Sequence, residues 1–112
     1  MTALIPSDPL RFIKDHVRDG RVLWTYHVNM RLAERHISRQ EVLGAVDSYE
    51  IIEQYPKGRH LPCYLVLARF EGDAFHVVFA VDVEGGNVRV VTAYWPDPGE
   101  WDIDLKTRRF AR

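Results

Sequence analysis

The sequence predicts an α+β domain, with helices in the first half packed on a mostly antiparallel meander sheet of about four strands. Up to residue 48, apolar residues recur at the three-to-four spacing of amphipathic helices. Beyond it, β-branched and aromatic residues dominate and the period becomes two, as in strands. With 112 residues, 46% of them hydrophobic, the chain can bury a core without disulfides or a metal. We therefore expect one domain over residues 1–112.

Helix start signals divide the first half into three helices. Asp8 followed by Pro9 is typical of an N-cap and a first helical position, where the missing N–H of proline costs nothing. Ser38 and Glu41 have the spacing of a capping box, which indicates another helix start. The expected helices run from Pro9 until Gly20, over residues 26–36 and from Ser38 onward, and residues 21–25 are interpreted as a short strand.

Four strands are expected in the second half, over residues 49–55, 63–70, 74–83 and 87–95. Short glycine-containing turns separate the last three, so these should form an antiparallel meander. The strand over 74–83 is apolar on both faces over its middle, which predicts a central position with helices covering one side. Trp101 is expected to pack the C-terminal segment back onto the domain.

Charge is unevenly distributed along the chain. The net charge of −1 argues against attraction of nucleic acid by the whole surface. However, residues 9–39 hold seven Lys/Arg against three acids, residues 71–104 hold eight acids and only Arg89, and the last seven residues are basic again. This segregation is compatible with a basic groove for phosphate beside an acidic face, or with ordinary solvated charge.

The first candidate for chemistry is a helical ridge of His27, Arg31 and Arg35. These residues are four positions apart, so on a helix each is rotated by only about 40° from the one before it. All three therefore share one face. Val28 and Leu32 should anchor that helix to the sheet and place His27 at the border between core and solvent. An imidazole there can act as a general acid or base, and guanidiniums can bind phosphate. The alternative is that the arginines pair with carboxylates and His27 packs locally.

Two further candidates lie in the predicted sheet. His76 is flanked by apolar residues in the middle of a strand, where a hydrogen-bonded core histidine is the alternative interpretation. Tyr94 shares one face of the last strand with Thr92. If the helix of His27 crosses this sheet, the ridge and these side chains would line one cleft.

The sequence contains no motif typical of a metal site or a phosphate-binding loop. The chain has no HExxH or CxxC, and Cys63 stands alone. Gly85 and Gly86 lie in a hairpin, so they do not form a phosphate loop before a helix. Catalysis is therefore expected to need no metal and no cofactor. The N-terminus lacks a signal peptide pattern and no stretch is apolar enough to span a membrane, so a cytoplasmic location is expected.

A longer pattern resembles a family of small bacterial proteins catalogued as domain of unknown function 4258. The likeness spans residues 25–101 and is carried by Thr25, His27, Arg31, Arg35, Ile37, Ser38, Glu41, Val42, residues 50–56, 76–78 and 90–98, and Trp101. Members look like distant relatives of the RelE-type and BrnT-type toxins, small ribonucleases that an antitoxin silences. The resemblance implies a RelE-like fold and metal-free RNA cleavage, with His27 as acid or base and Arg31 and Arg35 as phosphate clamps.

The leading hypothesis is therefore a ribonuclease or RNA-binding toxin that acts on RNA or the ribosome, with an antitoxin as partner and no membrane. Its site candidates are His27, Arg31, Arg35, His76 and Tyr94. The alternative is a non-catalytic protein-binding or structural module of the same fold. A third interpretation is a small-ligand binder that uses the aromatic edge around Tyr94. Whether the chain forms a homodimer stays open.

Overall fold

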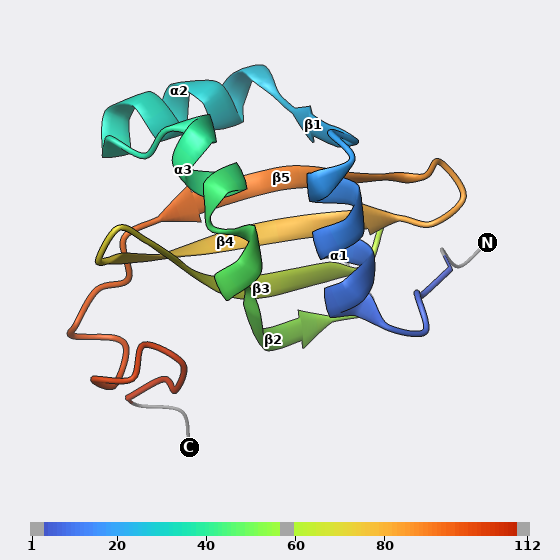
Figure 1. Cartoon of the computed structure of the whole chain (residues 1–112). Coiled ribbons are helices and arrows are strands. Elements are labelled where there is room, and N and C mark those ends of the chain that lie inside the picture. Colours follow the sequence, from blue (N-terminus) through green and yellow to red (C-terminus); the bar gives the residue numbers. More distant parts are fainter. Residues whose placement is uncertain (1–3, 57–59, 110–112) are drawn as a thin grey trace.

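The computed structural model describes residues 4–56 and 60–109. Helices and strands follow the order α1 (Pro9–Arg18), β1 (Val22–Trp24), α2 (Tyr26–Arg35), α3 (Arg39–Gly44), the 3-10 turn η1 (Val46–Ser48), β2 (Glu50–Tyr55), β3 (Cys63–Phe70), β4 (Asp73–Asp82) and β5 (Asn87–Tyr94). Figure 1 shows α1 and α3 lying across one face of the sheet, with α2 beside β5. The α+β prediction is confirmed, and the strand bounds lie within one residue of those expected.

The sheet has five strands in the order β1-β5-β4-β3-β2. Strands β2 to β5 form the expected antiparallel meander, and β4 is central. The expected count of about four strands was too low, because β1 adds a fifth strand and pairs parallel with β5 through Val22 and Val88. With three residues, β1 is too short to show a reliable period in the sequence, and its partner is distant along the chain.

The helix start signals form the hydrogen bonds that the sequence predicts. Asp8 accepts the backbone N–H of Arg11 at 3.1 Å. Ser38 accepts the N–H of Glu41 at 3.0 Å, and the Glu41 carboxylate accepts the N–H of Ser38 at 3.1 Å, which completes the capping box. These bonds satisfy N–H groups that a helix start would otherwise leave unpaired.

The main core lies between the helices and one face of the sheet. Buried side chains of the three helices, such as Ile13, Leu32 and Val42, pack against alternate residues of the strands, such as Val66 and Phe79. This alternation follows from the period of two in a strand. None of the helices described here is long and apolar enough to cross a membrane.

On the opposite face of the sheet, the C-terminal segment instead of a helix covers the part around His76. Leu65 and Leu67 are buried but lie outside the main core, because they point away from the helices. Trp101 is 2% exposed, which confirms that it packs the C-terminal segment back onto the domain. We call this side the helix-free face.

Candidate functional site

The helical ridge does not converge on the sheet. Val28 and Leu32 are buried and anchor α2 as predicted, but His27 is exposed, so its expected place at the border of the core was wrong. Arg31 is exposed and forms an ion pair with Glu34 at 3.7 Å. His27 and Arg31 each precede a buried residue, and one residue rotates by about 100° around a helix, which is enough to turn these side chains away from the buried stripe.

Arg35 takes a different position from the other two ridge residues. Its guanidinium donates hydrogen bonds to the Thr92 hydroxyl at 3.1 Å and to the Ala93 carbonyl at 2.7 Å. The backbone carbonyl of Arg35 accepts a hydrogen bond from the Trp95 indole N–H at 2.5 Å. Arg35 therefore attaches the end of α2 to β5 through neutral acceptors.

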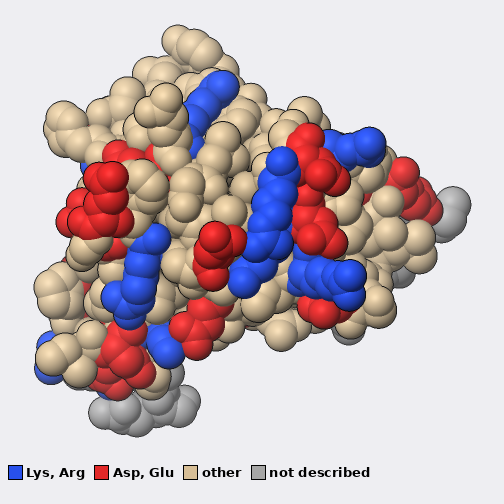
Figure 2. Space-filling model, viewed as in Figure 1, with Lys and Arg blue, Asp and Glu red and all other residues tan. Residues whose placement is uncertain are grey.

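Cationic side chains on the helix-covered face are interleaved with acidic ones. Figure 2 shows this face, with Lys and Arg lying beside Asp and Glu over its surface. Arg18 binds Asp47 at 2.7 Å and approaches Asp15 at 4.0 Å, and Arg11 approaches Asp15 at 3.7 Å. For the basic N-terminal half on this face, ordinary solvated charge is therefore a better interpretation than a basic groove for phosphate.

His76 and Tyr94 come together on the helix-free face. The two residues are paired across β4 and β5, and the Tyr94 hydroxyl lies 3.2 Å from His76 Nδ1. His76 Nε2 lies 2.8 Å from the Leu105 carbonyl, which can only accept, so Nε2 carries the proton and Nδ1 of the neutral ring accepts from Tyr94. Trp101 meets the imidazole edge to face, with ring centroids 4.5 Å apart.

The His76 side chain is fully buried. This desolvation lowers the pKa of the imidazole below its ordinary value, and the hydrogen bond to Leu105 opposes the shift only partly. Burial also raises the pKa of the Tyr94 phenol. The pair therefore holds a neutral imidazole as base beside a protonated phenol at neutral pH.

A carboxylate and a guanidinium lie next to this pair. Arg108 donates two hydrogen bonds to the Glu53 carboxylate, at 2.7 and 3.0 Å, and Tyr55 donates a third through its hydroxyl. The bonds from Arg108 lower the pKa of Glu53. The Arg108 guanidinium also stacks on Trp101, 4.6 Å from the ring centroid.

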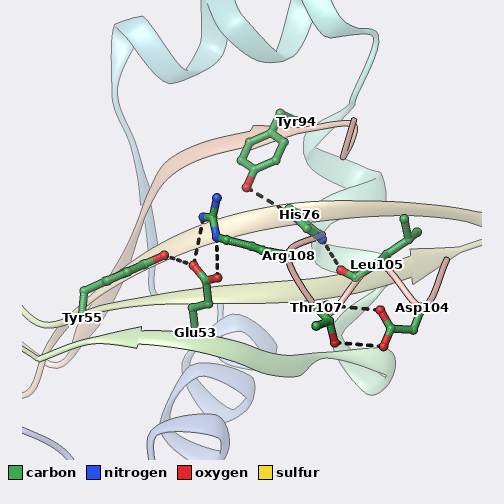
Figure 3. A network of polar contacts seen from close by, with 8 residues as sticks. All are labelled: Glu53, Tyr55, His76, Tyr94, Asp104, Leu105, Thr107 and Arg108. Carbon is green, nitrogen blue, oxygen red and sulfur yellow. Dashed lines mark hydrogen bonds and ion pairs between the residues drawn. The ribbon is translucent and has the colours of Figure 1, made fainter. Parts of the chain in front are cut away.

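Strand register explains how these residues meet. Glu53 of β2 is opposite Leu65 of β3, and Leu67 of β3 is opposite His76 of β4, so alternate residues of three strands share the helix-free face. Figure 3 shows Glu53, Tyr55, His76, Tyr94 and Arg108 turned toward one another from β2, β4, β5 and the C-terminal segment. We call these five residues the sheet-face cluster.

Sequence reasoning identified two members of this cluster and missed three. His76 and Tyr94 were predicted as candidates, whereas Glu53, Tyr55 and Arg108 were not. The spacing of two between Glu53 and Tyr55 places both on one face of a strand, which was an available signal. Nothing in the local sequence indicates that Arg108 reaches β2 across the sheet.

The cluster offers acid–base groups and a cation for an anionic group. Imidazole, phenol and carboxylate can move protons, and guanidinium can bind a phosphate with two parallel hydrogen bonds. Among residues 4–56 and 60–109, no group of three or more His, Cys, Asp or Glu side chains could hold a metal ion.

A family model described as domain of unknown function (DUF4258) matches residues 24–95. The chain belongs to this family. Glu53, Tyr55, His76 and Tyr94 lie within the DUF4258 match, whereas Trp101 and Arg108 lie beyond it. No curated protein and no solved structure matched the chain. The likeness to RelE-type and BrnT-type toxins therefore rests on the sequence pattern alone.

Proposed function

We propose that this protein binds and cleaves RNA without a metal, and that the reaction takes place at the sheet-face cluster. The proposal is carried by one observation: Trp101 contacts both the His76 ring, which is hydrogen-bonded to Tyr94, and the Arg108 guanidinium, so these groups gather on one face of the sheet. It moves the reacting groups from the helical ridge to the sheet, since His27 and Arg31 face solvent. The RelE-like relationship, an antitoxin or ribosome as partner and a cytoplasmic location are parts of the same proposal.

The chemistry follows from the protonation states of the cluster. Neutral His76 takes the proton of an RNA 2′-hydroxyl through Nδ1, and the 2′-oxygen attacks the adjacent phosphorus. The bond from phosphorus to the 5′-oxygen breaks as Tyr94 gives that oxygen its proton. The proton on His76 then restores Tyr94, and the products carry a 2′,3′-cyclic phosphate and a 5′-hydroxyl. Environments that push two pKa values apart are typical of such acid–base pairs.

Arg108 and Glu53 have supporting roles in this scheme. Arg108 stabilises the charge that develops on the phosphorane oxygens, because electrostatic stabilisation of a transition state usually contributes most to its catalysis. In the free protein, Glu53 holds Arg108 beside the site through their paired hydrogen bonds. The helical ridge contributes to binding at most, because it lies on another part of the surface.

The test is cleavage of a fluorescent single-stranded RNA by the purified full chain in EDTA, with analysis of the product ends. Tyr94→Phe should lower the cleavage rate by ~10²–10⁴-fold, because it removes the acid and keeps the ring. His27→Ala is the matched control and should keep the wild-type rate. Loss of cleavage in His27→Ala, with full activity in Tyr94→Phe, would show that the sheet-face assignment is wrong.

A second candidate is a non-catalytic binding or structural module. It is favoured by the complete burial of His76 and by the partners on both ring nitrogens, since such a network can simply hold the C-terminal segment in place. Expression of the intact chain in bacteria separates the two functions. The ribonuclease should arrest growth, and Tyr94→Phe should relieve the arrest. Harmless expression of the intact chain, together with unchanged RNA in EDTA, would favour the module.

A further inference from the structure

We propose that residues 101–109 form a lid over the sheet-face cluster, and that Lys106 and Arg108 exchange their carboxylate partners for phosphates when nucleic acid binds. The inference rests on the proposed function in one respect, namely that the ligand is a single-stranded nucleic acid. It adds a binding element outside the segment that matches DUF4258, and it explains how a buried imidazole reaches a substrate.

The segment covers the groups that would react. Trp101 lies against the His76 ring, and the Leu105 carbonyl accepts a hydrogen bond from the proton-bearing Nε2. Arg108 occupies both oxygens of the Glu53 carboxylate. In this closed arrangement no substrate phosphate can contact the imidazole, since its side chain is 0% exposed.

The segment folds on itself, so it can move as one piece. The Asp102 N–H donates to the Thr107 carbonyl at 2.8 Å, and the Leu105 N–H donates to the Asp102 carbonyl at 2.8 Å. The Asp104 carboxylate accepts the N–H groups of Lys106 and Thr107 at 2.9 and 3.1 Å. Opening the lid therefore breaks side-chain contacts with the sheet and leaves these internal bonds intact.

Two solvent-accessible ion pairs attach the segment to β2. Lys106 binds Glu50 at 3.0 Å with side chains 41% and 50% exposed, and Arg108 binds Glu53 with side chains 45% and 23% exposed. Ion pairs at such positions contribute little net free energy, because water and salt screen them. A phosphate is an equivalent acceptor for both cations, so a nucleic acid can replace the carboxylates.

This exchange has an electrostatic consequence for the site. While the lid is closed, Lys106 and Arg108 neutralise Glu50 and Glu53, so neither cation is available to a phosphate. Once Lys106 and Arg108 bind phosphates, the two side chains leave Glu50 and Glu53. The lid then opens and the His76 ring becomes accessible. Binding and exposure of the imidazole are then one event.

The first test measures binding of a fluorescein-labelled 2′-O-methyl RNA of ten nucleotides, which has no 2′-hydroxyl to attack. Arg108→Gln and Lys106→Gln should each weaken binding about ten-fold and lower the slope of log affinity against log salt by about 0.7, the value for one contact to single-stranded nucleic acid. Arg11→Gln is the control, since this exposed cation belongs to α1. Equal affinities for all variants, or no binding by the wild type, would overturn the lid.

The second test locks the segment in place. Glu50→Cys and Lys106→Cys, in a Cys63→Ser background, can be joined by a short bismaleimide, and the same protein with each thiol capped singly is the matched control. The joined protein should bind the oligonucleotide at least about ten-fold more weakly than the capped one. Equal affinity of the two forms would overturn the lid.

The two proposals fail in different ways. Binding that depends on Lys106 and Arg108, without cleavage of ordinary RNA, would support the lid proposal and contradict the ribonuclease activity. Cleavage at an equal rate by the joined and capped proteins would contradict the lid and support the ribonuclease.

Discussion

Among single residues, His76 determines how mild acid affects this protein. Its side chain is buried and both ring nitrogens have partners, so the folded state favours the neutral ring and the pKa is lowered from 6.5. Such a group stabilises the fold above the pKa of the unfolded chain. That stability is lost as the pH falls through the lower pKa of the folded state.

We therefore predict that the free energy of unfolding decreases as the pH falls from 6.5 toward 5, by at most about 1.4 kcal/mol per pH unit for one proton. The measurement is urea unfolding over this pH range. His76→Gln should flatten the profile, and His27→Gln, at an exposed position, should keep it. A ring titration by NMR with a His76 pKa above 6.5 would contradict the prediction without any variant.

Glu53 acts in a separate pH window. The hydrogen bonds from Arg108 lower the pKa of this carboxyl from its ordinary 4.5, so the stability it contributes is present above 4.5 and is lost only at lower pH. Glu53→Gln should change the unfolding profile below pH 4.5 and leave the change between pH 6.5 and 5 in place. An altered profile near pH 6 in this variant would show that the two groups titrate together.

For the helices and strands, the starts of α1, α2 and α3 are the best-specified local features. Each has a side-chain cap, from Asp8, Thr25 and Ser38 respectively. The helix α3 depends most on its cap, since a helix of six residues is too short to be stable by propensity. Its buried residue Val42 packs against the sheet only while that turn is formed.

Ser38→Ala should lower the free energy of unfolding by ~1 kcal/mol, because the N–H of Glu41 loses its partner and the capping box opens. Thermal and urea unfolding measure this loss. The control is Gln40→Ala at the exposed second position of the same helix, which should change stability by less than about 0.5 kcal/mol. An equal effect of the two substitutions would mean that the capping box does not stabilise α3.

Across the whole molecule, the two faces of the sheet are packed differently. One face carries helices that pack through a continuous apolar core, and the other carries a segment held by one tryptophan and a set of polar contacts. Local opening is expected where apolar contacts are few and polar contacts are solvent-accessible. The C-terminal segment should therefore open without unfolding of the sheet.

Native-state hydrogen exchange should detect this difference. The amides of Asp102 and Arg109 should exchange roughly 100-fold faster than those of Val77 and Phe79 in the central strand β4. A locally opening amide is also insensitive to low denaturant concentrations, which provides an internal control. Equal protection of both sets would show that the segment and the sheet unfold together.

The sequence by itself determined the helices and strands. Caps, glycine turns and hydrophobic periods depend on residues a few positions apart, so Ser38, Glu41 and the strand repeats could be interpreted without a structure. The same local reasoning placed His76 in the middle of a strand and Tyr94 on the face of its neighbour. Their pairing followed once the register of the meander was formed.

Only the tertiary structure decided which of these side chains meet. Helical spacing predicted that His27, Arg31 and Arg35 share a face, but not whether that face looks at the sheet or at solvent. The parallel pairing of β1 with β5 and the contact of Arg108 with Glu53 likewise join residues that are distant along the chain. A local pattern depends on backbone geometry alone, whereas a site depends on how separate elements pack, and packing is settled by the burial of the whole core.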